Sequence, residues 1–432
     1  MVATAPGNIT AQNVQVRCQV NGQTFTPYGY TVHSGTYGSG GSCDIHTSVE
    51  ALRAAGIDLI GLAELAPSSL PVDIYLFLDG DRTHLFGGEY VKAEWQYDHS
   101  AIQIHCRDWT GVLMDEKNVL TKQSGVETQN QSVGQIVTSI ANKYGLKPVL
   151  HLTSDPTPSN TTIGSQFGSE DRTYMPRAQS GWATLTSLAR ANGYEVHTTP
   201  DKELVFGEPG AGLPTLMLAY QQNPVPSGFI PVRSLQIEHN PRRNKSFKVV
   251  VQSYDPSSAQ ITRGESVVIG SNMSTQNNQT INTGQWSGAA AYQASNSLSA
   301  GKKKVPIYTF RADGLTADQA QQRADSIATD IAKRELILSV MADTVPSIQL
   351  MQKMKLQGPT IEPEFAAHDY WLNSFTHEMH MAAGARGAHA EFSTHMKALD
   401  VQDLGEGDSV STGKGRRGRG RVANPKTPGM LE

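Results

Sequence analysis

The sequence has 432 residues, which is long enough for two to four domains that each bury a core. A hydrophobic share of 38%, a charged share of only 18% and 40 glycines are typical of a turn-rich globular protein, and this mixture favours β structure. The formal net charge of −4 excludes an overall electrostatic attraction to nucleic acid or to an anionic membrane, so any such contact must come from a local patch.

The cysteines and the N-terminal sequence limit the class of protein further. Cys18, Cys43 and Cys106 are odd in number and lack a Cys-x-x-Cys pairing, which argues against a disulfide framework and a zinc knuckle. We therefore expect reduced, buried thiols. Residues 1–12 lack the basic start and apolar run of a signal peptide, and no segment approaches the roughly 18 apolar residues of a membrane span. We expect no membrane insertion, and a protein that stays in the cytosol unless a larger particle incorporates it.

The first predicted domain covers residues 1–114. Apolar and polar residues alternate on either side of Asn21-Gly22, the strongest short signal for a β-hairpin. The stretch from Thr47 to Glu50 has the pattern of a capping box, which predicts a short helix. A strand then leads into a turn at Asp79-Gly80, and two further strands follow, the last at 100–108. These elements predict a small antiparallel barrel that carries one helix.

The second predicted domain, residues 115–208, consists of short α/β units. A capping box at Ser132-Val-Gly-Gln135 predicts a helix that stops at Gly145. A second helix, WATLTSLARAN, is expected to end at Gly193, and a hairpin around Pro200-Asp201 follows it directly. We interpret this block as an inserted αβ domain.

The third predicted domain covers residues 209–400. Strands are expected at 232–240 and 245–255, and four more complete a second antiparallel set before residue 400. A Ser/Asn/Gln/Gly-rich tract at 256–304 is too polar to bury much and is interpreted as an exposed insertion or a mobile loop. We therefore predict a second tube-like β-barrel with a polar insertion.

A long helix is predicted at 317–334, before the last strands. Its inward stripe is narrow and built mainly of small residues: Ala320, Ala324, Ile327, Ala328 and Ile331. Small residues permit close approach to another surface, which we interpret as packing on the chain's own barrel, with a subunit contact as the alternative. Beyond it, residues 401–432 form a basic Gly/Arg-rich extension that we expect to be disordered in the free protein.

The stretch from Asp79 to Leu113 resembles the end of the first barrel in baseplate hub proteins of contractile-tailed bacteriophages, the late-control D-like tail proteins. The same fold makes up the N-terminal half of type VI secretion spike proteins. The resemblance covers about residues 10–400 through the order and spacing of its parts. The matching positions are Cys106, Arg107, Asp108 and Leu113, then Tyr144, Gly145 and Leu146, then Trp182, Leu188, Ala189 and Gly193, followed by an Ala-rich helix.

This resemblance implies two tube-like barrels per chain, so that a homotrimer presents six barrels in a pseudo-sixfold ring. Such a ring joins the hexameric tail tube to a trimeric central spike, and DNA passes through its lumen without sequence-specific binding. The implied partners are the tail tube protein, the central spike protein, baseplate wedge proteins and a tape-measure protein. The spike must be a separate chain, because no lysozyme-like segment or β-helical repeat follows Asp400. The implied location is the baseplate of the virion tail, which assembles in the host cytoplasm. The resemblance implies no cofactor and no enzymatic activity.

Residues 105–117, HCRDWTGVLMDEK, place a histidine, a thiol, an arginine and an aspartate side by side, as in a hydrolase site. Strand alternation points Cys106 inward, however, and a buried apolar thiol has a raised pKa and poor nucleophilicity. We interpret Arg107, Asp108 and Trp109 as a structural junction that fastens the first barrel to the inserted block through hydrogen bonds. We assign no catalytic residue.

Four histidines near the C-terminus are the better candidates for chemistry: His377, His380, His389 and His395. The HEMH spacing is not that of HExxH, and on a strand its two imidazoles point to opposite faces. Pairing across a hairpin, or one histidine per chain on a threefold axis, would be needed to bind a metal. We expect ordinary solvated or core histidines and assign no metal.

Two further segments have functional alternatives. The loop GTYGSGGSC at 35–43 lacks the Lys-Ser/Thr pair of a phosphate-binding loop, so we expect a flexible surface loop. The C-terminal basic residues are either solvated or able to dock into an acidic groove of a neighbouring baseplate or spike protein, with contact to nucleic acid as a weaker alternative. These partner-binding candidates are Lys414, Arg416, Arg417, Arg419 and Arg421.

Two other functions remain open from the sequence. One is a metal-dependent or cell-wall-directed hydrolase that uses the histidine cluster. The other is a component of a type VI secretion spike, against which the missing fused spike argues.

Overall fold

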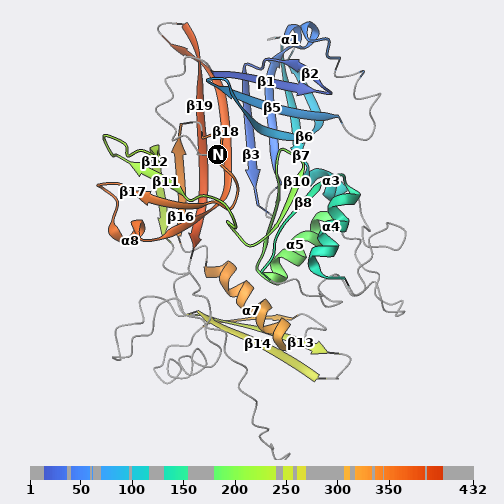
Figure 1. Cartoon of the computed structure of the whole chain (residues 1–432), viewed down its shortest axis with the longest axis vertical. Helices are drawn as coiled ribbons and strands as arrows, with labels where there is room; N and C mark the ends of the chain where they lie inside the picture. The colour runs from blue at the N-terminus through green and yellow to red at the C-terminus, as the bar shows by residue number, and fades with distance from the viewer. Residues whose placement is uncertain are drawn as a thin grey trace, which may run out of the picture.

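The computed structural model describes residues 14–36, 40–58, 61, 70–96, 100–115, 131–153, 180–239, 247–255, 260–268, 306–311, 317–332, 336–343, 345–384 and 387–401. Most of the strands join a single sheet of thirteen strands, and the remaining strands form two separate three-stranded sheets (Figure 1). The prediction of a mainly β chain with α/β insertions is confirmed. Among the described residues, no helix combines the length and hydropathy needed to cross a membrane.

The first seven strands form the N-terminal part of the large sheet, in the order β3-β4-β7-β6-β5-β1-β2. Every pair is antiparallel, and β6 changes register at Tyr90/Lys92, so the sheet bends across its own core (Figure 1). We call this part the N-terminal sheet. Its strands are β1 (Val14–Val20), β2 (Gln23–Phe25), β3 (Gly29–Gly35), β4 (Ser42–Ser48), β5 (Pro71–Leu78), β6 (Asp81–Gln96) and β7 (Ala101–Asp108).

Local signals set the turns of this sheet. At both predicted hairpins the two central residues have positive φ, 50° and 79° at Asn21-Gly22 and 50° and 96° at Asp79-Gly80, as a two-residue type I′ turn requires. Helix α1 (Val49–Ala54) begins one residue later than predicted, because Ser48 Oγ caps it by accepting a hydrogen bond from Ala51 N at 3.1 Å. Thr47 is fully buried on strand β4 and cannot serve as the cap.

The C-terminal part of the large sheet is a closed six-stranded ring, in the order β17-β11-β12-β16-β19-β18 and back to β17. Lys353 and Met354 pair with Trp371 and Tyr370, and these pairs close it. The ring is mixed, because β11 is parallel to both of its neighbours. Its elements are β11 (Leu216–Tyr220), β12 (Phe229–His239), β16 (Leu336–Ala342), β17 (Lys353–Gln357), β18 (Asp369–Gly384) and β19 (Gly387–Val401), with the short helix α8 (Pro363–Ala366) between β17 and β18.

A strand pairing fuses the two parts into one sheet. Strand β3 pairs with β18 from Gly35↔Ser374 to Tyr30↔Met379. Because β18 is 16 residues long, its first half lines the ring core, which contains Tyr370, while Met379 reaches the core of the N-terminal sheet. Side chains reinforce the seam, where Thr36 Oγ1 donates to Asn373 Oδ1 at 3.0 Å. The two β units are therefore joined by a shared backbone ladder.

The α/β unit between them has its own sheet and core. Its three strands lie in the order β8-β10-β9, with β8 parallel and β9 antiparallel to β10. The predicted capping box is present at Ser132 and Gln135, and Gly193 ends the last helix with φ at 71°. The elements are α3 (Thr110–Asp115), α4 (Val133–Lys143), β8 (Lys147–His151), α5 (Gly181–Asn192), β9 (Glu195–Thr198) and β10 (Glu203–Gly207).

Between β12 and β16 the chain leaves the ring and builds a third unit. Strands β13 (Phe247–Asp255), β14 (Gln260–Val268) and β15 (Ile307–Arg311) form a sheet that helix α7 (Ala317–Ala332) covers (Figure 1). We call these elements the α7 unit. The strand expected at 245–255 therefore does not belong to the second barrel, because the alternating apolar residues of β13 pack on α7. Strand β14 falls inside the tract expected to be a polar insertion; residues 256–259 and 269–304 lie outside the described residues.

The small-residue stripe of α7 packs on this sheet and not on a barrel. Ala320, Ala324 and Ala328 are fully buried against Phe247, Val249 and Val251. The approach is so close that a Cβ added to Gly264 would lie 2.0 Å from the Ala320 carbonyl oxygen. The domain boundaries drawn after residues 114, 208 and 400 stay predictions.

Candidate functional site at the meeting of three units

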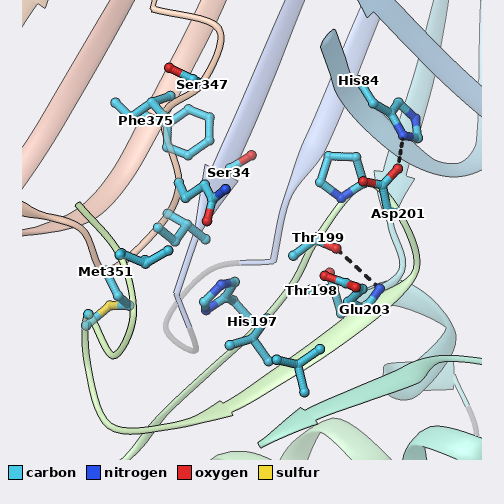
Figure 2. Close-up of a pocket in the computed structure, with 18 of the residues that line it drawn as sticks. Ser34, His84, His197, Thr198, Thr199, Asp201, Glu203, Ser347, Met351 and Phe375 are labelled. Carbon is cyan, nitrogen blue, oxygen red and sulfur yellow. Dashed lines mark hydrogen bonds and ion pairs between the residues drawn. The ribbon is translucent and has the colours of Figure 1, made fainter. Parts of the chain in front are cut away.

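A pocket opens where the N-terminal sheet, the α/β unit and the ring meet (Figure 2). Its volume is about 440 Å³. Strand β6, the β9–β10 hairpin, the segment before β17 and strand β18 supply its walls. We call it the junction pocket and define it by its main polar lining residues, which are Arg82, His84, Glu195, His197, Asp201, Glu203, Glu208 and His377.

Asp108 sits at the base of the hairpin that forms one wall. Its carboxylate accepts hydrogen bonds from Gly41 N at 2.8 Å, from Thr110 N at 3.1 Å and from Thr198 Oγ1 at 3.2 Å, and a further one from Thr110 Oγ1. Burial raises the pKa of Asp108, and these hydrogen bonds work against that rise. One carboxylate thus connects the loop before β4, the start of α3 and the end of β9.

Trp109 holds the tip of the same hairpin. Its ring is buried in the core of the α/β unit, and its Nε1 donates a hydrogen bond to Pro200 O at 3.2 Å. The Lys202 ammonium lies 4.3 Å from the centre of the ring, within cation–π distance. Strand β6 approaches from the other side, where a Cβ at Gly87 would lie 2.2 Å from Pro200 O. The hairpin tip therefore rests directly on the N-terminal sheet.

Arg107 contributes to the edge of the junction and not to the pocket. Its guanidinium donates to Glu89 Oε2 at 3.2 Å and also binds Asp115. The hydrogen bond to Asp115 raises the pKa of Arg107 most, and burial opposes that rise. Because the Glu89 side chain is only 6% exposed, Arg107 neutralises a carboxylate that would otherwise be buried alone. The structural role predicted for Arg107, Asp108 and Trp109 stays a proposal that this geometry supports.

His84 is a junction residue that the sequence did not reveal. One ring nitrogen lies 2.7 Å from Asp201 Oδ1 on the hairpin (Figure 2). The other lies 3.1 Å from Asp73 Oδ1 on β5, and the ring stacks on Tyr75. Burial alone would lower the pKa of His84, but the hydrogen bonds to the two aspartates outweigh it, so the pKa is raised. No local motif marks this contact, because Asp201 is 117 positions away in the chain.

Two other histidines of the pocket are buried and neutral. Desolvation lowers the pKa of His377 to about 4, and it lowers that of His197 to about 4 with a smaller contribution from His151. His377 Nδ1 lies 2.9 Å from Thr394 Oγ1. His197 is 8% exposed, and its Nδ1 has no hydrogen-bond partner among the described residues. A neutral imidazole can accept a hydrogen bond at such a nitrogen.

The C-terminal histidines do not gather at one point. His377 is buried, whereas His380 is exposed and lies 3.3 Å from Glu391, so the two point to opposite faces of β18 as predicted. His395 Nε2 lies 3.6 Å from Glu378 Oε2, and the side chain of His389 lies outside the described residues. Among the residues that the structure describes, no group of three or more His, Cys, Asp or Glu side chains has the arrangement of a metal site.

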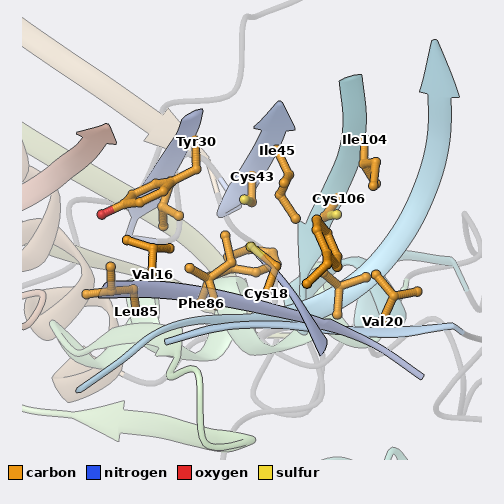
Figure 3. Packing of buried hydrophobic residues seen from close by; sticks show 14 of the residues in the cluster. Val16, Cys18, Val20, Tyr30, Cys43, Ile45, Leu85, Phe86, Ile104 and Cys106 are labelled. Atoms are coloured by element: carbon orange, nitrogen blue, oxygen red, sulfur yellow. The ribbon is translucent and has the colours of Figure 1, made fainter. Parts of the chain in front are cut away.

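The three thiols lie together in the core of the N-terminal sheet (Figure 3). Cys18, Cys43 and Cys106 are free and buried, which confirms the prediction. Burial raises the pKa of all three, and neighbouring thiols add to the rise for Cys18 and Cys43. His105 points to the opposite face of β7, where its Nδ1 lies 2.6 Å from Asp44 Oδ1. The stretch at 105–117 therefore does not bring a histidine to its cysteine.

Two predicted segments are only partly described. In the glycine-rich loop at 35–43, residues 37–39 lie outside the described residues, and Gly41 N donates to Asp108. The basic C-terminal candidates all lie outside them: Lys414, Arg416, Arg417, Arg419 and Arg421.

Comparison with known proteins gives matches among solved structures. No family model and no curated protein matches the sequence. A tail protein from Neisseria meningitidis MC58 superposes over 91% of this chain and 98% of its own, with a TM-score of 0.59 and 13% identity. The 43 kDa tail protein of prophage MuSo2 from Shewanella oneidensis covers 89% of this chain and 98% of its own, with a TM-score of 0.52 and 14% identity.

A component of the type VI secretion system from E. coli also aligns, over 91% of this chain and 78% of its own, with a TM-score of 0.43 and 12% identity. The two tail proteins each cover about nine-tenths of the chain. The chain therefore has the fold of the phage tail proteins that the sequence resembles.

Proposed function

We propose that this protein is the structural hub of a phage or phage-like tail baseplate, where it joins the tail tube to the central spike. The observation that carries the proposal is the fused pair of β units, a curved seven-stranded sheet and a closed six-stranded ring joined by β3 and β18. Agreement with the fold of two tail proteins along almost the whole chain supports it.

The physical basis of this function is symmetry matching. A trimer in which each chain carries two β units presents six units in one ring, so a threefold spike below can meet a sixfold tube above. The shared ladder between β3 and β18 suits this task, because it fixes the two units relative to each other through backbone hydrogen bonds. A rigid pair is needed if six units are to form a regular surface.

The same proposal specifies partners and place. The protein forms a homotrimer and contacts the tail tube protein, a separate central spike protein, baseplate wedge proteins and a tape-measure protein. DNA passes through the lumen of the ring without sequence-specific contacts. The complex assembles in the host cytoplasm and becomes part of the virion tail. We assign no catalytic step, since the thiol of Cys106 is buried with a raised pKa and His377 is a buried, neutral core residue.

The experiment that tests this function is a mass measurement. The purified full-length chain is analysed by light scattering and native mass spectrometry, alone and mixed with a tail tube protein and a spike protein from the same genome. We expect three copies per particle. The trimer should stay intact in solution, because obligate interfaces of this kind commonly bury more than about 2,000 Å². A chain that stays monomeric alone and with both partners contradicts the proposal.

A further inference from the structure

The junction pocket has a chemistry that the proposed hub function does not use. Carboxylates from Glu195, Asp201, Glu203 and Glu208 line it, and Arg82 supplies the one guanidinium among the described lining residues. Three of these acids already have interactions within the chain: Asp201 binds His84, Glu203 binds Lys147 at 2.7 Å, and Glu195 also has a partner. The wall is nevertheless rich in hydrogen-bond acceptors, and it carries a net negative charge.

His197 is an independent sign that the pocket takes a ligand. Its side chain is more than nine-tenths buried, it lies among the pocket-lining side chains in Figure 2, and its Nδ1 has no hydrogen-bond partner among the described residues. A buried polar atom without a hydrogen-bond partner destabilises the folded chain. Desolvation keeps the ring neutral at physiological pH by lowering its pKa to about 4, so this nitrogen can accept a hydrogen bond. A ligand that only donates hydrogen bonds fits both the nitrogen and the carboxylates.

Arginine is the side chain that meets this description. Its guanidinium carries five N–H donors and no acceptor, and it binds carboxylates with two parallel hydrogen bonds. This chain has four arginines and a lysine within residues 414–421, spaced mainly by glycines. Glycines leave room beside each arginine, so that a narrow segment can insert one or two side chains into a cavity of about 440 Å³.

The end of the described chain lies close to the pocket. Val401, the last residue of β19, pairs with Asp369, two positions before Trp371 on β18. The Trp371 ring packs on Gly210, where an added Cβ would lie 2.1 Å from it, and Gly210 lines the pocket. From Val401 to Lys414 the chain can span up to about 45 Å at ~3.4 Å per residue. The basic segment can therefore reach the pocket of its own chain.

We infer that the junction pocket binds the basic segment 414–421 of the same chain, with an arginine side chain placed against His197 and Glu208. Because the segment is covalently attached next to the site, its effective concentration is high and a modest intrinsic affinity is enough to keep the pocket occupied. Since walls from all three units contact it, the bound segment would also fasten them together. This goes beyond the hub function, which does not depend on it.

The test measures binding of a fluorescein-labelled peptide of residues 411–422, STGKGRRGRGRV. The host is the full-length chain in which the five basic residues are replaced by Gln, which leaves the pocket vacant: K414Q, R416Q, R417Q, R419Q and R421Q. We expect saturable binding of one peptide per chain. The same peptide with Gln at its five basic positions should not bind.

Pocket variants in this host locate the binding site. Glu195→Gln with Glu208→Gln should weaken peptide binding at least tenfold. Glu238→Gln with Glu364→Gln removes the same charge at exposed positions outside the pocket and should change it less than twofold. Because Glu195 is partly buried, the exposed Glu208→Gln is also tested alone, and at least a threefold loss is expected. The chain with its native segment should bind the peptide at least fivefold more weakly than the host.

Three results would overturn the inference. The first is no peptide binding to the host, and the second is equal losses in the pocket pair and the control pair. The third is binding of duplex DNA by the native chain, if this binding requires the basic segment and does not change with Glu195→Gln and Glu208→Gln. That result would assign the segment to nucleic acid. None of these results changes the expected mass of the assembly, so the two proposals can fail independently.

Discussion

Two junctions of this molecule use opposite chemistry. The α/β unit meets the N-terminal sheet through buried polar side chains, with Asp108 accepting hydrogen bonds from three segments and His84 placed between Asp73 and Asp201. Helix α7 packs on its sheet through Ala320, Ala324 and Ala328. Because these side chains are small, the helix backbone can lie close to the strands.

The two junctions therefore respond to different perturbations. Hydrogen bonds to buried titratable groups depend on protonation and fix one geometry, because each donor must meet its acceptor. Contacts between small apolar residues depend on volume and scarcely on pH. We therefore expect the polar junction to be sensitive to pH and to loss of a single carboxylate, and the α7 unit to be sensitive to added atoms.

The largest expected effect is the response of the junction pocket, which His197 and His377 line, to acid. His197 and His377 have pKa values of about 4 in the folded chain and about 6.5 when unfolded, so protonation favours the unfolded state. Their stabilisation is complete above about pH 6.5 and is lost as the pH falls toward 4, by an amount on the order of a few kcal/mol for the pair. Hydrogen exchange, corrected for intrinsic rates, should rise in β9, β10 and residues 345–351 between pH 6.5 and 4.5.

The α7 unit is the internal control for that experiment. Burial raises the pKa of Asp325, so acid favours its folded form and the exchange of α7 should not rise in the same range. His197→Gln with His377→Gln should flatten the acid response of the junction. If the pH dependence of hydrogen exchange is unchanged in that double variant, other titratable groups cause the acid response.

The next effect is the loss of the Asp108 carboxylate. Asp108→Ala removes the acceptor for Gly41, Thr110 and Thr198 and leaves buried donors unpaired, which we expect to cost about 2–4 kcal/mol of unfolding free energy. Urea unfolding followed by fluorescence measures it, and exposed Asp81→Ala should cost less than about 0.5 kcal/mol. Equal costs for the two variants would rule out the network as a source of stability.

A smaller and more local effect is expected from Gly264→Ala. The new methyl group would lie 2.0 Å from the Ala320 carbonyl oxygen, so α7 must move away from β14 at a cost of about 1–3 kcal/mol. Exchange should rise in β13, β14 and α7 and stay unchanged in β9 and β10. The control is Arg263→Ala on the same strand, where the side chain is 53% exposed. If Gly264→Ala leaves exchange in the α7 unit unchanged, the close packing is not what holds the helix.

The smallest effect concerns His84→Gln. We expect a loss of about 0.5–1 kcal/mol, because the partner Asp201 is 73% exposed and solvent weakens the pair. The folded pKa of His84 is raised, so its contribution is complete below about pH 6.5 and disappears as the pH rises through the folded pKa. Urea unfolding at pH 6 and at pH 8.5 should show a difference between native and variant chains that shrinks at the higher pH. A difference that grows with pH would contradict the assignment.

The sequence predicted those parts of the structure that local chemistry determines. Asn21-Gly22 and the Ser132 capping box act over two to four residues, and both are present. Strand alternation predicted that Cys106 is buried and that His377 and His380 diverge. The alternation in β13 likewise predicted a strand, but it carries no information about which sheet the strand joins.

The candidate site was harder to predict, because its contacts are distant in sequence. Asp108 stood out as polar after an apolar strand, yet its partner Thr198 is 90 positions away. His84 and Asp201 are ordinary turn-proximal residues until the hairpin is placed on β6. The pocket arises only where three units meet, so no single segment carries a signal for it.

A three-dimensional image reconstruction of the purified full-length protein by electron microscopy, without imposed symmetry, tests the proposed hub directly. We expect a closed ring of three chains in which the N-terminal sheets and the six-stranded rings alternate, giving six β densities around one axis. A single-chain particle, or an assembly whose two β units do not share one ring, would contradict it.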